Sequence, residues 1–183
     1  MKLSTKDLIL TALFTALMIA GAFIRIPFPL LPVTLQALFC ALAGLILGPH
    51  LGALSMTVYT VLGLIGIPVF AQGGGITYIF NKSFGFILGF IVGAYIIGKL
   101  SKKHKTPSKA NSIKAVITGL IAIYLLGMTY MFVMIRFYSG NTQVGLWYVI
   151  TTNLPYLIKD IILFIAAAIA STSILPVLTR FRT

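Results

Sequence analysis

Asp160 is one of only two acidic residues in this chain of 183 residues, and it stands near the start of a long apolar stretch. Tyr156 precedes it by four residues and Phe164 follows by four, so in a helix the three side chains share one face. An ionisable group in an apolar surrounding is expensive and is by default a candidate functional group. A carboxylate beside aromatic rings suits a neutral ligand that carries N–H donors. The alternatives are an ion pair with Arg136, Lys82 or Arg25, or a role at a helix start near Pro155.

Amide and hydroxyl groups gather in segments rich in proline and glycine. The stretch PFPLLPVTLQ, residues 27–36, places Thr34 and Gln36 directly after three prolines. Thr34 fits either a ligand pocket or a helix cap, whereas Gln36 favours the pocket. The GGG run that contains Gly74 and Gly75 either brings backbone N–H groups to a ligand or forms a simple re-entrant turn. Further candidate contacts are Tyr78, Asn81, Lys82 and Asn153.

No set of catalytic residues can be assembled from this sequence. The chain has no glutamate, no pair of acids and no phosphate-binding glycine loop of the Walker type. Its single cysteine, Cys40, lies inside an apolar stretch and fits a small buried side chain. We therefore expect no enzyme activity, no metal and no cofactor, and any ATP hydrolysis would belong to other proteins.

The composition indicates a membrane protein. Hydrophobic residues make up 59% of the chain, charged residues 9%, and the mean hydropathy is +1.06. Soluble domains contain about 25% charged residues, so we expect the surrounding solvent to be lipid. Apolar stretches near 8–25, 33–48, 51–69, 84–100, 113–135 and 155–177 predict six transmembrane helices. We expect one all-α transmembrane domain over residues 1–183.

The net charge of +12 is explained by topology. With the N-terminus inside, ten of the fourteen basic residues fall on the cytoplasmic side, most of them at the N-terminus and in the lysine-rich stretch 99–114. This asymmetry predicts that both termini are cytoplasmic, and it argues against nucleic-acid binding. The first apolar stretch is too long for a signal peptide and lacks a cleavage site.

Small residues recur one turn apart in two of the predicted helices. Gly85, Gly89 and Gly93 form one series, which we interpret as close packing within the bundle. Ala12, Ala16 and Ala20 form the other series, which could equally present a smooth face to another membrane protein. Three longer segments, 25–36, 66–85 and 136–156, fall on the predicted outer side, and the last contains the only tryptophan, Trp147.

Residues 28–93 resemble the BioY family, the biotin-specific substrate-binding (S) components of energy-coupling-factor (ECF) transporters. PVTLQ, AGLILGP, LGALS, YTVLGLIGIPVFA and GGG arrive in that family's order, and YLIKDII around Asp160 continues the resemblance. It implies a six-helix protein of a prokaryotic cell membrane that captures biotin from outside. The implied partners are a transmembrane coupling subunit, docked on Ala12, Ala16 and Ala20, and two cytoplasmic ATPase subunits.

The resemblance implies that Asp160 accepts from the ureido N–H groups of biotin, with Gln36 and Thr34 at the pocket mouth. Trp147, Tyr78 and Phe86 would cover the rings and the valeryl chain. Two departures stand out. The family's Pro-Thr-Gly-Gly-Tyr run corresponds here to KSFGF, residues 82–86, and Leu163 replaces a common lysine.

Lys159 is about 100° from Asp160 around a helix, so Lys82, Arg136 and Arg25 are the candidate cations for the ligand carboxylate. The alternative functions are an S component for another small vitamin and a membrane assembly protein without transport activity.

Overall fold

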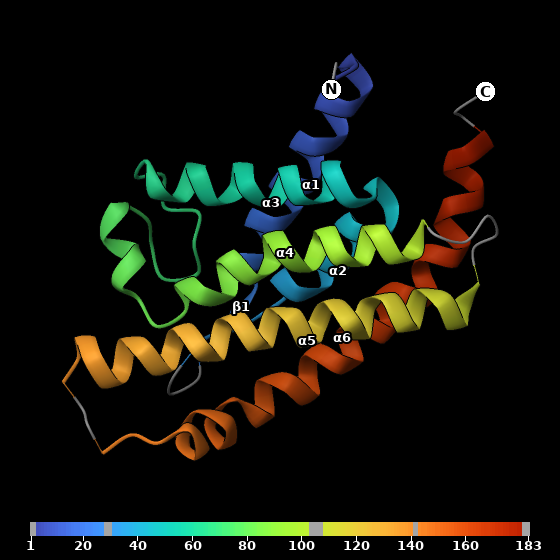
Figure 1. The fold of residues 1–183 in the computed structure, drawn as a ribbon. Helices are drawn as coiled ribbons and strands as arrows, with labels where there is room; N and C mark the ends of the chain where they lie inside the picture. The colour runs from blue at the N-terminus through green and yellow to red at the C-terminus, as the bar shows by residue number, and fades with distance from the viewer. Residues whose placement is uncertain (1–2, 28–30, 103–107, 141–142, 181–183) are drawn as a thin grey trace.

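Six α-helices make up most of the protein in a computed structural model (Figure 1). It describes residues 3–27, 31–102, 108–140 and 143–180, the last seven of these by their backbone alone. The helices are α1 (Thr5–Phe23), α2 (Gln36–Leu47), α3 (Pro49–Leu64), α4 (Phe84–Ser101), α5 (Lys109–Val133) and α6 (Leu146–Arg180). Four short elements lie between them: β1 (Arg25–Ile26), β2 (Val33–Thr34), a 3-10 helix η1 (Ile76–Phe80) and a π-helical turn η2 (Met134–Tyr138). The predicted helical class is confirmed.

Four of these helices are long and apolar enough to cross a membrane. They are α1, α4, α5 together with η2, and α6 up to Ser173. The other two helices, α2 with 12 residues and α3 with 16, fall short of the roughly 20 residues that a perpendicular span needs. Helices therefore occur in all six predicted regions, whereas six complete spans remain a prediction.

Helix α6 begins at Leu146, nine residues before the predicted start at 155. The second half of the segment 136–156, which we expected to lie outside the helices, is therefore helical. Polar side chains of this segment donate to backbone carbonyls of the preceding helical turn. The Thr151 hydroxyl donates to the Trp147 carbonyl at 2.9 Å, and the Asn153 amide donates to the Val149 carbonyl at 2.8 Å. Pro155 stands inside the helix, as prolines do in membrane helices where nearby groups satisfy the freed carbonyl.

Asp7, the second acid of the chain, caps the start of α1. Its backbone N–H donates to the Ser4 hydroxyl at 3.2 Å, and its carboxylate accepts from the Ser4 backbone N–H at 3.0 Å. This reciprocal capping box satisfies backbone donors that a helix start leaves unpaired. The cap gives Asp7 a local structural role, so Asp160 is the acid that needs another explanation.

The glycine series of α4 lies against α5, as the packing interpretation predicted. A Cβ atom on Gly85 would clash with the Cβ atom of Tyr130 on α5, so a larger residue would force the two helices to shift. The alanine series behaves differently, because Ala12, Ala16 and Ala20 are all exposed on α1. Their series therefore faces away from the bundle.

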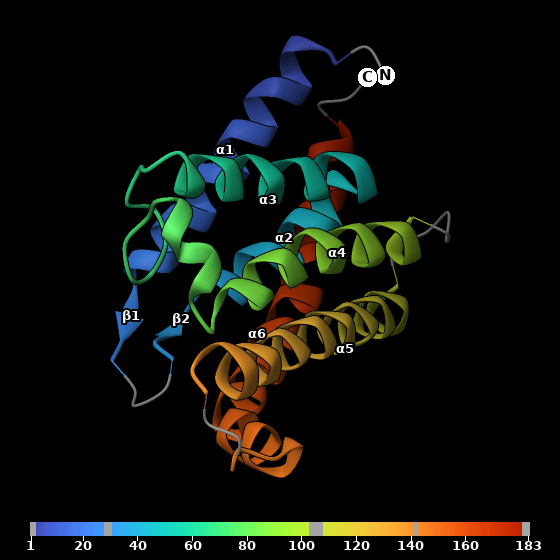
Figure 2. The same ribbon diagram turned by 60° about the vertical axis from the view of Figure 1, so that its left-hand side comes forward.

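The first residues of α1 and the last turns of α6 lie at the same end of the molecule, away from the β1–β2 pair (Figures 1 and 2). The two short strands pair antiparallel, with Arg25 opposite Thr34 and Ile26 opposite Val33. Pro29, in the proline-rich stretch 27–36, lies outside the described residues, as does the centre of the lysine-rich stretch at 103–107. The β1–β2 pair and the segment that holds η1 both border the cavity described next.

Candidate ligand-binding site

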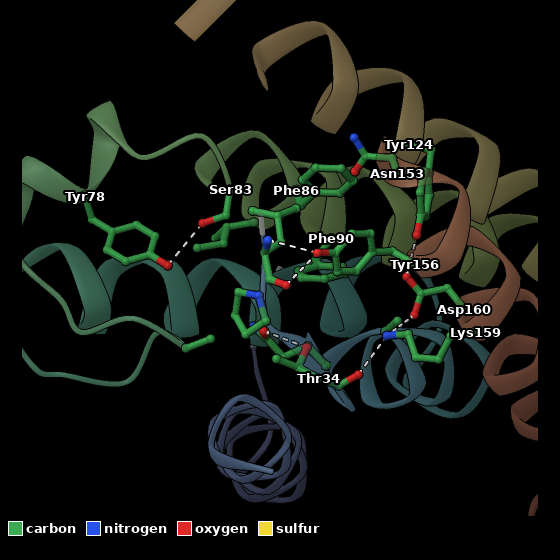
Figure 3. A pocket seen from close by; sticks show the side chains of 16 residues that line it. Thr34, Tyr78, Ser83, Phe86, Phe90, Tyr124, Asn153, Tyr156, Lys159 and Asp160 are labelled. Carbon is green, nitrogen blue, oxygen red and sulfur yellow. Dashed lines mark hydrogen bonds and ion pairs between the residues drawn. The ribbon is translucent and has the colours of Figure 1, made fainter. Parts of the chain in front are cut away.

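A cavity lies where α2, α4, α5 and α6 meet below the two connecting segments, and its empty space, counted together with the part that is open to solvent, is about 600 Å³. It is lined by Leu31, Pro32, Thr34, Gln36, Ala37, Ala71, Tyr78, Ser83, Phe86, Ile87, Phe90, Tyr124, Asn153, Tyr156, Lys159 and Asp160. The lining therefore combines residues from nearly the whole length of the chain. Figure 3 shows two polar groups on opposite sides of Phe86 and Phe90, so the cavity has two polar ends and an aromatic middle.

Asp160 forms the first polar end, together with the two side chains that hold its carboxylate (Figure 3). The Tyr124 hydroxyl donates to Oδ2 at 2.8 Å, and the Lys159 Nζ lies 2.5 Å from Oδ1 as an ion pair. Lys159 also donates to the backbone carbonyl of Thr34 at 2.8 Å. The carboxylate is thus held in place and balanced by a cation, as a buried acid must be.

Lys159 was not among the predicted cations. Adjacent helix residues point about 100° apart, but the flexible four-carbon stem of a lysine lets its ammonium return to the neighbouring carboxylate. Lys82 and Arg25 are exposed, and the Arg136 guanidinium donates to the Val144 carbonyl at 3.2 Å. None of these three lines the cavity.

Asn153 adds an unsatisfied acceptor near the same end. Its side chain is 1% exposed, and its amide nitrogen donates to Val149 in the preceding turn. Its Oδ1 atom is buried and has no hydrogen-bond partner among the described residues. Buried acceptors are normally paired, so an oxygen left open in the wall of a cavity indicates a place for a donor on a ligand.

Gln36 is hydrogen-bonded to both Thr34 and Tyr59. The Thr34 hydroxyl donates to Gln36 Oε1 at 3.0 Å, and Gln36 Nε2 donates to the Tyr59 hydroxyl at 2.9 Å. Tyr59 is fully buried and donates onward to the Val69 carbonyl at 3.3 Å. A primary amide has two N–H donors and an oxygen with two lone pairs, so Gln36 keeps a donor and an acceptor for a ligand.

Tyr78 and Ser83 form the second polar end, with their hydroxyls 3.1 Å apart. Burial raises the pKa of the Tyr78 hydroxyl, against the opposing effects of the Ser83 hydrogen bond and of the positive charge of Arg25. The phenol is therefore protonated at neutral pH and can donate. When KSFGF is aligned with the family's Pro-Thr-Gly-Gly-Tyr run, Ser83 takes the place of the threonine. A hydroxyl group is therefore kept at this position.

Seven of the twelve predicted ligand contacts line the cavity, namely Thr34, Gln36, Tyr78, Phe86, Asn153, Tyr156 and Asp160. Five others, Gly74, Gly75, Asn81, Lys82 and Trp147, do not. Trp147 is 75% exposed, because the early start of α6 places it on the outside of that helix. Asn81 donates to Gln72, and the N–H of Gly75 donates to the Gly63 carbonyl at 2.7 Å, which makes the glycine run a turn.

Tyr124, Ser83 and Lys159 are the polar lining residues that sequence reasoning missed. Tyr124 could have been predicted from the sequence, because a tyrosine hydroxyl inside an apolar helix needs a hydrogen-bond partner. Asp160 is the acid that lies in an apolar stretch and could serve as that partner. Phe86 packs edge-on against Tyr124 with 5.5 Å between ring centroids. It thus supports the Tyr124 ring although it lacks a hydroxyl of its own.

The architecture matches solved membrane-transport proteins. The S-component for biotin from an ECF-type ABC transporter superposes with a TM-score of 0.80 and 25% identity, covering 94% of each chain. The S component of a bacterial ECF transporter, at 19% identity and a TM-score of 0.51, shares the fold. The fold and the enclosed site thus define a multi-pass membrane protein of the S-component class.

Sequence comparison identifies the family within that class. The model of the BioY family matches residues 1–180, and the chain belongs to that family. A probable biotin transporter BioY from Lysinibacillus sphaericus is 38% identical over 98% of this chain and 91% of that protein. A biotin transporter BioY from Thermotoga maritima is 40% identical over 67% of this chain and 72% of that protein. The resemblance inferred from the motifs is confirmed.

Proposed function

We propose that this protein captures biotin at the outer face of a prokaryotic cell membrane and delivers it to an ATP-driven ECF transporter. The observation that carries the proposal is the cavity, whose two polar ends and aromatic middle suit the chemistry of biotin. Membership of the BioY family and the likeness to a biotin S component support the same ligand.

The ureido ring belongs at the Asp160 end. A cyclic urea offers two N–H donors and one carbonyl acceptor. Asp160 and the unsatisfied Asn153 Oδ1 supply two acceptors at this end, and Lys159 Nζ supplies a donor. A ureido N–H group would therefore be the hydrogen-bond donor that Asn153 Oδ1 lacks.

The carboxylate of the valeryl chain then belongs at the Tyr78–Ser83 end. The Ser83 hydroxyl donates to Asn81 Oδ1 at 2.9 Å, so the donor available to the carboxylate is the Tyr78 hydroxyl, on which the positive charge of Arg25 acts. Between the ends, Phe86, Ile87 and Phe90 provide an apolar wall for the fused rings and the methylene chain. A mostly apolar pocket with few directed polar groups is the usual design of a small-molecule site.

The six-helix topology with both termini in the cytoplasm is part of this proposal. It places the lysine-rich end inside, and it places the β1–β2 pair and η1 outside, above the cavity. The single domain spans residues 1–183. A coupling subunit would dock on exposed Ala12, Ala16 and Ala20, because small residues permit close approach between membrane helices. Two ATPase subunits would supply the energy, since this chain shows no catalytic set for hydrolysis.

Calorimetric titration of the purified protein with biotin tests the proposal, with thiamine and riboflavin as controls. Nanomolar affinity, about −12 kcal/mol, is expected for biotin alone. Biotin methyl ester, which lacks the carboxylate charge, is expected to bind about ten-fold more weakly, because a charge-assisted hydrogen bond contributes about 1.5 kcal/mol. Absence of biotin binding, or tight binding of another vitamin, would overturn the proposed substrate.

A further inference from the structure

A second groove runs along the outside of α5 and α6, separate from the ligand cavity but sharing one wall with it. It is lined by Ile117, Leu120, Ile121, Tyr124, Leu125, Met128, Leu157 and Ile161. Apart from the Tyr124 hydroxyl, which donates to Asp160 inside the protein, every lining side chain is apolar. Ile121 and Leu125 are 55% and 63% exposed, so the groove opens to the surface of the two helices.

Its dimensions match one leaflet of a bilayer. From Ile117 to Met128 the groove follows eleven residues of α5, which at the helical rise is about 16 Å. The hydrocarbon core of a bilayer is about 30 Å thick, so half of it is about 15 Å. A hydrocarbon chain that enters from one membrane surface would therefore end near Met128.

A positive charge stands at the end of the groove where a headgroup would lie. Lys114 is exposed on α5, and it precedes Ile117 by three residues and Ile121 by seven, so the three share a face. Helical side chains lean toward the N-terminus, so Lys114 extends away from the groove, toward the membrane surface at that end. An anionic phosphate is the natural partner of an ammonium in that position.

The lining argues against a protein helix as the occupant. Membrane helices meet through glycine, alanine and serine, which let backbones approach. The groove lining contains none of these residues, and its large aliphatic side chains suit a thin flexible chain. We therefore propose that this groove holds one acyl chain of a phospholipid, with the anionic headgroup at Lys114.

The site has a consequence for ligand binding through Tyr124. Tyr124 lines both the groove and the ligand cavity, and its hydroxyl donates to the Asp160 carboxylate. An acyl chain packed on the outside keeps the ring in the position that forms this bond. Bound lipid thus forms the outer support of the ligand site.

Spin-label spectroscopy of the protein in phosphatidylcholine nanodiscs tests the proposal. Phosphatidylglycerol or phosphatidylcholine labelled near the chain end reports the fraction of lipid with restricted mobility. We expect phosphatidylglycerol to be favoured, and Lys114→Gln to lower that preference about five-fold. Ile121→Trp, which fills the groove from its exposed edge, should remove about one restricted lipid per protein.

The matched control is Ile162→Trp on α6, at a residue that is 63% exposed and does not line the groove. Helix content by circular dichroism confirms folding of each variant. If Ile162→Trp removes as much restricted lipid as Ile121→Trp, or if Lys114→Gln leaves the preference unchanged, the proposal fails. If Ile121→Trp leaves bound lipid unchanged but alters the oligomeric state, the groove is a protein interface instead. None of these readouts depends on biotin.

Discussion

The Tyr156 hydroxyl holds the backbone of Leu31 by two hydrogen bonds, although the two residues are 125 positions apart in the chain. It donates to the Leu31 carbonyl at 2.8 Å and accepts from the Leu31 N–H at 3.0 Å. Lys159, one turn further along α6, holds the Thr34 carbonyl. The segment that borders the cavity is thus fastened to the same helix that carries Asp160.

Tyr156→Phe is expected to speed the release of biotin. The substitution removes both bonds to Leu31 and keeps the ring. Each neutral hydrogen bond contributes about 1 kcal/mol, so the dissociation rate should rise about ten-fold or more. Stopped-flow displacement of a fluorescent biotin derivative measures that rate.

The control for this prediction is Tyr148→Phe, which removes a hydroxyl from a 47% exposed residue of the same helix. It should leave the dissociation rate unchanged. Equal rates for Tyr156→Phe and the parent protein would show that the two bonds do not retain the ligand.

Asp160→Asn is expected to lower biotin affinity about 30-fold. The amide keeps the size of the side chain but loses the charge-assisted bonds, which contribute about 2 kcal/mol to a ligand. It also leaves the partly buried Lys159 ammonium without its counter-charge. Asp7→Asn is the matched control, since Asp7 caps α1 and does not line the cavity. Unchanged affinity in the Asp160 variant would remove this carboxylate from the ligand site.

Lys159→Gln distinguishes between the two orientations of biotin in the cavity. If Lys159 donates to the ureido carbonyl, as proposed, the variant should weaken biotin and biotin methyl ester by the same factor, about ten-fold. A loss confined to biotin would place the carboxylate at Lys159 and reverse the orientation. Lys82→Gln, at an exposed residue outside the lining, should leave both affinities unchanged.

Ala16→Leu is expected to separate assembly from ligand capture. Ala16 is exposed on α1, so a larger side chain should fit without disturbing the bundle or biotin affinity. It should reduce co-purification of the coupling subunit at least ten-fold, because close helix approach requires a small residue. Ala110→Leu, at an exposed position on α5, is the matched control. Intact assembly of the Ala16 variant would exclude this face as the docking surface.

The parts of the site that could be predicted depend on local chemistry. Asp160 was identifiable because an acid in an apolar stretch is costly, whatever surrounds it. Thr34 and Gln36 were identifiable because they stand in the motif PVTLQ. In contrast, Trp147 and Asn81 were chosen for their residue type and region, and neither region nor type says which way a side chain points.

The sequence alone determined the helical membrane class, because hydropathy is a property of each segment, and it determined the family through the order of its motifs. It also singled out Asp160, the acid at one polar end of the cavity. Only the tertiary structure decided that Lys159 and Tyr124 hold this acid, that Asn153 has an open acceptor, and that the alanine series faces outward. These features depend on contacts between segments distant in the chain, such as the 125 residues that separate Thr34 from Lys159, and helix packing alone brings such segments together.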